Sequence, residues 1–106
     1  GFNVYPRMVE EAVLLHPAVA EVAVCGVPDL HRGEIIKAFV ALKEGERVSA
    51  GELRAFLKES LAPFQLPRQI EFLESLPKTL IGKISKKELL ADGVAAAPAI
   101  EDISRI

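Results

Sequence analysis

Lys83 is the residue of this sequence best placed to do chemistry, because it follows Gly82 near the centre of a turn-rich stretch, Pro77–Glu88. A proline fixes φ and a glycine tolerates a positive φ, so both residue types favour turns. Ser85-Lys86-Lys87-Glu88 then matches a capping box, in which a serine hydroxyl and a glutamate carboxylate satisfy free N–H groups at a helix start. We therefore predict Lys83 on an exposed loop directly ahead of a helix N-terminus, where an ammonium and the helix dipole together favour a phosphate or carboxylate ligand.

The simplest alternative for Lys83 is a solvated loop lysine, since most lysines are exposed and take no part in chemistry. Lys86 and Lys87 fit that description, because they fall on the solvated face of the predicted helix. Another alternative is a small nucleic-acid-binding module that uses Lys78, Lys83, Lys86 and Lys87 as a phosphate patch. The formal net charge of -2 and the lack of stacking aromatic residues near these lysines argue against it.

The composition of the chain is that of one globular domain, since 50% of its 106 residues are hydrophobic and 26% are charged. No apolar run approaches the ~20 residues that span a bilayer, and no signal segment opens the chain. We therefore expect a cytoplasmic protein with no transmembrane segment. The single cysteine, Cys25, excludes an internal disulfide and a cysteine-based zinc site. We expect a buried thiol there, and no metal site in this chain.

Two kinds of hydrophobic pattern alternate along the chain. Apolar residues at helical spacing follow Pro6 and the Ser49–Glu52 capping box, whereas β-branched residues and period-two alternation mark three strands. In chain order we predict helix 6–15, strands 19–27 and 34–42, helix 50–61, strand 68–73 and helix 85–90. This order indicates the α+β class, with a small three-stranded sheet covered by helices. Residues 1–90 form this domain, and residues 91–106 are predicted to be a flexible C-terminal tail.

Four segments of the chain resemble motifs of one enzyme superfamily. Pro77-Lys78-Thr79-x-x-Gly82-Lys83 resembles the last core motif of the acyl-adenylate-forming superfamily, which contains acyl-CoA and aryl-CoA synthetases, luciferases and peptide-synthetase adenylation domains. The other matches are Gly1-Phe2-Asn3-Val4-Tyr5-Pro6 with its continuation to Val19, Gly26-Val27-Pro28-Asp29 with Gly33-Glu34, and Pro63-Phe64-Gln65-Leu66-Pro67-Arg68. Together they cover about residues 1 to 90 and resemble the small C-terminal lid domain of these enzymes. The resemblance implies the same α+β architecture and a large N-terminal domain that precedes Gly1.

For the adenylation step, the resemblance implies a role for the residues of the last motif. Lys83 occupies the position of the lysine that contacts the acyl carboxylate, ribose and phosphate. Gly82, Thr79 and Lys78 would support the loop that carries it. A lysine suits this task, because it is a compact charge on a long stem.

For the thioester step, the resemblance implies contacts with CoA. Gly1 falls where the family's backbone lines the pantetheine tunnel after the small domain has rotated. The residues predicted to contact CoA are Gly1, Phe2, Asn3 and Lys58. Asn3 stands where some CoA synthetases have an arginine, so that charge is missing here. Lys58 also fits the exposed face of its helix.

On this resemblance we predict the C-terminal domain of an ATP-dependent, AMP-forming acyl-CoA synthetase, with a fatty acid as the favoured substrate. Other expected partners are its own N-terminal domain, which would bind most of the ATP and Mg²⁺, and CoA as co-substrate. The isolated chain is expected to be inactive. An alternative from a different class is a stand-alone module that docks on a partner protein.

Overall fold

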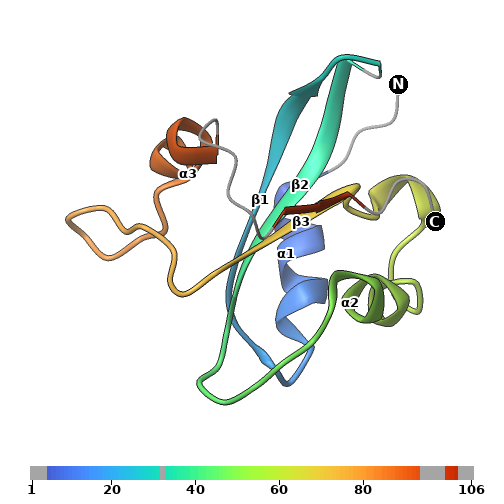
Figure 1. The fold of residues 1–106 in the computed structure, drawn as a ribbon, viewed down its shortest axis with the longest axis horizontal. Helices are drawn as coiled ribbons and strands as arrows, with labels where there is room; N and C mark the ends of the chain where they lie inside the picture. The colour runs from blue at the N-terminus through green and yellow to red at the C-terminus, as the bar shows by residue number, and fades with distance from the viewer. Residues whose placement is uncertain (1–4, 32, 94–99, 103–106) are drawn as a thin grey trace.

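The computed structural model describes residues 5–31, 33–93 and 100–102, which form a sheet with helices on both faces (Figure 1). Helix α1 (Pro6–Leu14) has Pro6 in its first turn, where the missing N–H of proline costs nothing. After the helix ends, His16 Nδ1 accepts a hydrogen bond from the Ala18 N–H at 3.1 Å. The His16 ring also packs edge-on against Phe56, so this histidine holds the turn between α1 and the sheet.

The sheet contains four strands in the order β1 (Val19–Asp29), β2 (Gly33–Leu42), β3 (Gln69–Leu73) and β4 (Ile100–Asp102). β1 and β2 form an antiparallel hairpin, β3 is parallel to β2, and β4 is antiparallel to β3. The parallel pair is possible because helix α2 (Ala50–Leu57) and the 3-10 turn η1 (Pro63–Gln65) carry the chain back to the start of β3. The α+β class and the three predicted strands are confirmed, and β4 adds a short strand at the edge.

The helix that follows β2 begins where the sequence predicts and ends earlier. Ser49 Oγ accepts a hydrogen bond from the Glu52 N–H at 3.1 Å, and Glu52 Oε1 accepts one from the Ser49 N–H at 3.2 Å. The predicted capping box is therefore present. Helix α2 nevertheless ends at Leu57, and the chain continues in turns to Leu61, which is still buried in the core.

The last helix extends past its predicted end at Leu90. Helix α3 (Lys86–Gly93) continues into the stretch predicted as a tail, and β4 also falls within that stretch. Part of residues 91–106 thus has regular structure, while residues 94–99 and 103–106 lie outside the described residues.

One face of the sheet packs against α1 and α2 (Figure 1). Val9 and Val13 of α1 and Leu53 and Leu57 of α2 are completely buried there. Their partners from the strands are Val22, Val24, Ala38, Val40 and Ile70. This cluster contains only apolar side chains and forms the larger part of the core.

The opposite face of the sheet packs against α3 and the segment that precedes it. Cys25 and Phe39 lie on this face, in one buried cluster with Leu76 and Leu89. Cys25 is a buried free thiol, as predicted, and burial raises its pKa. The segment before α3 contains Lys83, so this second face positions the predicted catalytic residue.

Candidate functional site

The stretch around Lys83 is a tight hairpin rather than an open loop, and we call Pro77–Ser85 the Lys83 hairpin. The Thr79 N–H donates to the Lys83 carbonyl at 2.6 Å, and the Ser85 N–H donates to the Pro77 carbonyl at 2.7 Å. Lys78 and Ile84, which lie between these two pairs, form an antiparallel bridge. The backbone of the hairpin is therefore fixed by its own hydrogen bonds.

The turn at the tip of the hairpin depends on Gly82. Its N–H donates to the Thr79 carbonyl at 2.9 Å, and its φ of 87° lies in the left-handed region that glycine adopts most easily. A turn followed by one left-handed residue is a common three-residue hairpin loop. A Cβ on Gly82 would meet no atom within 4 Å, so backbone conformation rather than space calls for glycine. The Thr79 hydroxyl also accepts a hydrogen bond from the Lys83 N–H at 3.2 Å.

The Lys83 side chain is exposed, and within the described part of the chain it has no ion pair and no hydrogen bond. Leu80 and Ile81, at the tip of the same hairpin, have exposed fractions of 107% and 78%. The hairpin thus presents an unpaired ammonium next to two large apolar side chains. Such an arrangement suits a contact with another protein surface that holds an anion.

Lys78 connects the first arm of the hairpin to β1. Its Nζ lies 2.6 Å from Glu21 Oε2 and also donates to the Leu76 carbonyl at 3.0 Å. Glu21 Oε1 in turn accepts a hydrogen bond from the Leu76 N–H at 3.4 Å. Because Lys78 donates to the Glu21 carboxylate, the pKa of Glu21 is lowered from its ordinary value.

Lys86 connects the start of α3 to the body of the domain, and this differs from the solvated side chain that the sequence predicts. Its Nζ lies 2.9 Å from Glu10 Oε2. The same carboxylate oxygen accepts a hydrogen bond from the Val24 N–H at 2.8 Å, so Glu10 joins α1, β1 and α3. Lys87 is exposed and has no such partner among the residues that the structure describes.

The predicted capping box at Ser85 is only half formed. Ser85 Oγ accepts a hydrogen bond from the Glu88 N–H at 3.3 Å. The Ser85 N–H does not bind the Glu88 side chain, because it donates to the Pro77 carbonyl inside the hairpin. Ser85 therefore belongs both to the hairpin and to the N-terminal cap of α3, and α3 begins directly after the hairpin.

The residues predicted to contact CoA do not all fall within the described structure. Gly1, Phe2 and Asn3 lie outside it. Lys58 is exposed at the C-terminal end of α2, where its N–H donates to the Arg54 carbonyl at 3.1 Å. Because α2 and the Lys83 hairpin cover opposite faces of the sheet, the structure does not bring Lys58 to Lys83 (Figure 1).

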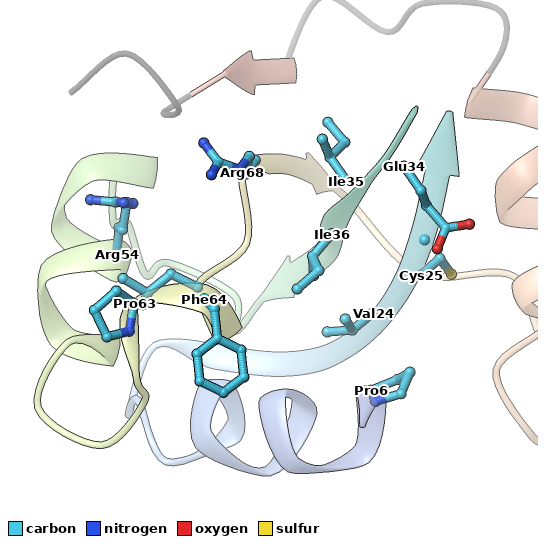
Figure 2. A pocket seen from close by; sticks show the side chains of 12 residues that line it. Pro6, Val24, Cys25, Glu34, Ile35, Ile36, Arg54, Pro63, Phe64 and Arg68 are labelled. Carbon is cyan, nitrogen blue, oxygen red and sulfur yellow. The ribbon is translucent and has the colours of Figure 1, made fainter. Parts of the chain in front are cut away.

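A groove of about 500 Å³, which the sequence patterns do not predict, lies between α1, η1 and the strands (Figure 2). Phe64 of η1 is partly exposed in it, and Arg68 lines it from the turn before β3. Arg54 of α2 also lines it, and its Nε is buried with no hydrogen-bond partner among the described residues. Phe64 and Arg68 belong to the Pro63–Arg68 motif. The only sequence feature that could have indicated this groove was therefore an aromatic residue and an arginine beside two prolines.

The groove is lined by two arginines, the Phe64 ring and the Glu34 carboxylate, together with apolar side chains. Arginine binds phosphate through a planar fork of N–H donors, and an aromatic ring offers a face on which a nucleobase can stack.

Metal binding and membrane insertion find no support in the part of the chain that the structure describes. There, no group of three or more His, Cys, Asp or Glu side chains could hold a metal ion. Nor is any helix in residues 5–31, 33–93 or 100–102 long and apolar enough to cross a membrane.

Fold and site together define a small α+β domain that presents Lys83 on a hydrogen-bonded hairpin and two arginines in a separate groove. The chain belongs to the family of AMP-binding enzyme C-terminal domains, whose family model matches residues 8–83. The matched segment includes the whole apolar cluster under α1 and α2 and ends at Lys83.

The relatives of the chain are acid–CoA ligases. It is 50% identical over 92 residues to the long-chain-fatty-acid–CoA ligase of Bacillus subtilis, and 50% identical over 94 residues to the acetyl-coenzyme A synthetase of the same organism. These alignments cover 87% and 86% of the chain. Among solved structures, the Mycobacterium tuberculosis fatty acyl CoA synthetase matches 92% of the chain and 19% of its own length, with a TM-score of 0.83 and 38% identity.

The chain spans only 16% of the length of each of the two Bacillus subtilis enzymes. The chain therefore corresponds to the small domain of a ligase.

Proposed function

We propose that the chain is the C-terminal lid domain, residues 1–90, of an ATP-dependent, AMP-forming acyl-CoA synthetase, and that Lys83 is its adenylation lysine. The observation that carries this proposal is the Lys83 hairpin, whose exposed ammonium has no partner among residues 5–31, 33–93 and 100–102 and lies at the end of a segment shared with acid–CoA ligases. Leu80 and Ile81 beside it are exposed, as expected for a hairpin tip that enters the site of a larger domain.

The chemistry explains why a lysine is needed. An acid carboxylate attacks the α-phosphorus of ATP, the acyl-adenylate forms, and pyrophosphate leaves. The step brings two anions together, and a fixed cation between them stabilises the charge that builds up in the transition state. In this proposal Lys83 supplies that cation, while Lys78, Thr79 and Gly82 hold its hairpin. Mg²⁺ and most of the ATP would be bound by the N-terminal domain, so the isolated chain should be inactive.

Thioester formation would use the other side of the domain. We assign the groove of Arg54, Phe64 and Arg68 to the nucleotide end of CoA, because this end carries phosphates and an adenine ring. Lys58 lies one helical turn after Arg54 and could add a further cation. Gly1, Phe2 and Asn3 remain candidates for the pantetheine arm. Since the Lys83 hairpin and this groove lie on opposite sides, a rotation of the domain would exchange one for the other.

The acyl substrate is not determined by this domain in the proposal. The relatives that act on a long-chain fatty acid and on acetate are each 50% identical to the chain. Substrates of such different size with equally similar lid domains imply that the acyl pocket lies elsewhere in the enzyme. A fatty acid remains the favoured substrate on the sequence resemblance.

The alternatives are less well supported. A nucleic-acid patch would need free lysines, but Lys78 and Lys86 are already paired with Glu21 and Glu10. A stand-alone docking module would explain the exposed Leu80, Ile81 and Lys83, but not the match of the chain to a domain of acid–CoA ligases.

The test compares Lys83→Ala with Lys87→Ala in the full-length ligase. Both changes remove one exposed lysine from the same region. We expect Lys83→Ala to reduce carboxylate-dependent ATP–pyrophosphate exchange by about 10²- to 10³-fold, or roughly 3 to 4 kcal/mol, by analogy with loss of one preorganised donor. Thioester formation from a supplied acyl-adenylate should be retained, and Lys87→Ala should change neither reaction. Unchanged exchange in Lys83→Ala would reject the proposal and favour a docking role.

A further inference from the structure

Two carboxylates tie the Lys83 hairpin to the body of the domain, one at each end. At the first arm, Glu21 of β1 pairs with Lys78 at 2.6 Å and accepts the Leu76 N–H. Just beyond the second arm, Glu10 of α1 pairs with Lys86 at 2.9 Å. Both carboxylates come from elements far from the hairpin in sequence.

Each carboxylate is itself fixed by its surroundings. The Glu10 side chain is 21% exposed and also accepts the Val24 N–H from β1 at 2.8 Å. The Glu21 side chain is 26% exposed, and its two oxygens contact different groups, the Lys78 ammonium and the Leu76 N–H. Such doubly bound carboxylates define a position more narrowly than a single surface ion pair, because two contacts restrict the side chain at once.

The hairpin between these two points has a hydrogen-bonded backbone but little apolar contact of its own. Its tip residues Leu80 and Ile81 are exposed, and only Ile84 of the hairpin packs, partly buried, against the second face of the sheet. The backbone hydrogen bonds set the shape of the hairpin but not its direction. Its direction relative to the sheet is set where the chain enters and leaves it, next to Lys78 and Lys86.

We propose that Glu10 and Glu21 are positioning residues that orient the Lys83 hairpin for adenylation. This inference rests on the proposed function of Lys83. The two glutamates do not touch the substrate, because their side chains are engaged with Lys78, Leu76, Lys86 and Val24 on the body of the domain. They act through the angle at which the hairpin leaves the sheet, and an error of about 1 Å at a reacting group can cost about a hundredfold in rate.

The experiment uses Glu10→Gln and Glu21→Gln in the full-length ligase. Glutamine keeps the size of the side chain and an oxygen that can accept the backbone N–H, but it removes the charge that holds the lysine. The matched control is Glu11→Gln, since Glu11 is the next residue of α1 and forms only an exposed pair with Arg7 at 3.5 Å. Three quantities are measured: ATP–pyrophosphate exchange, thioester formation from a supplied acyl-adenylate, and the melting temperature.

We expect each of Glu10→Gln and Glu21→Gln to lower ATP–pyrophosphate exchange by about tenfold. This is less than the roughly hundredfold loss for an error of about 1 Å, because the other contact still holds the hairpin. Thioester formation and the melting temperature should remain close to those of the Glu11→Gln control. Adding Lys78→Gln to Glu21→Gln should cause little further loss of exchange, because both substitutions break the same ion pair between Lys78 and Glu21.

The remaining outcomes separate this proposal from the function on which it rests. If Lys83→Ala abolishes exchange while both glutamine variants keep it, the positioning role is wrong and the role of Lys83 stands. If exchange, thioester formation and melting temperature fall together, the glutamates only stabilise the fold and the positioning role is also wrong. If Lys83→Ala itself leaves exchange unchanged, the proposed function fails, and the positioning role fails with it.

Discussion

The two faces of the sheet differ in the side chains that stabilise them, and strand β2 shows the difference most clearly. Along β2, Ile36, Ala38 and Val40 face the apolar cluster with α1 and α2. Their neighbours Lys37 and Phe39 face the opposite side, toward α3 and the Lys83 hairpin. The first face is held mainly by apolar packing, whereas the second face includes a buried ion pair.

That charge is Lys37, which pairs with Glu71 of β3. The Lys37 Nζ lies 2.8 Å from Glu71 Oε1 and 4.7 Å from the centre of the Phe39 ring, and both charged residues are less than 5% exposed. The two groups therefore form a buried ion pair. Apolar packing tolerates many side chains of suitable size, but a buried pair fails when either partner is lost. The face that supports the Lys83 hairpin is thus the more specific of the two and the easier to disrupt by one substitution.

The largest expected effect follows from removing one partner of this pair. Lys37→Met leaves the Glu71 carboxylate buried without its cation, and we expect a loss of about 3 to 5 kcal/mol in the free energy of unfolding. Urea unfolding followed by circular dichroism measures it. The control is Lys43→Met, which removes an exposed lysine just after β2 and should change stability by less than about 0.5 kcal/mol.

The double variant Lys37→Met with Glu71→Leu sharpens the same comparison. Replacing both charges with apolar groups should return the stability close to that of the original chain or above it. If the double variant is as unstable as Lys37→Met alone, the second face does not behave as an apolar face with one inserted ion pair, and the contrast drawn here is wrong.

A smaller effect is expected in the hairpin that this face carries. Gly82→Ala places a side chain at a φ of 87°, which costs about 1 to 2 kcal/mol in an L-residue. Because the strain falls on the tip, exchange should fall more than thioester formation. Gly51→Ala is the matched control, since Gly51 lies in α2 and alanine favours a helix by about 0.5 to 1 kcal/mol. Equal loss of both reactions in Gly82→Ala would contradict a local role for the turn.

The sequence predicts the local features of both faces well. The capping box at Ser49, the turn glycine at position 82 and the alternation along β2 each depend on residues close together in the chain, and the structure contains all three. Local patterns of this kind have local causes, namely the satisfaction of free N–H groups, a permitted positive φ and the two-residue period of a strand.

Features that join distant segments were missed. The pairing of Lys86 with Glu10 and of Lys37 with Glu71 depends on how helices and strands pack, and each lysine alone fits an exposed position equally well. A lysine at position 37 of an otherwise apolar strand indicates a buried charge, but it does not identify the partner on β3. The groove of Arg54 and Arg68 was missed for the same reason, because its two arginines come from different elements.

The smallest expected effect is the pH dependence of the contact between Glu21 and Lys78, and it separates this contact from the apolar face. The lysine lowers the folded-state pKa of Glu21, so the contact contributes stability above the unfolded-state pKa and loses it as the pH falls through the folded-state pKa. Since the two side chains are 26% and 40% exposed, solvent screening limits the contribution to a fraction of about 1 kcal/mol.

Glu21→Gln should therefore be slightly less stable than the original chain at neutral pH, and the difference should vanish in acid. Leu53→Ala, on the apolar face, should instead show a deficit of about 2 to 5 kcal/mol that does not depend on pH. A difference for Glu21→Gln that persists below the folded-state pKa would show that the side chain acts through packing rather than charge.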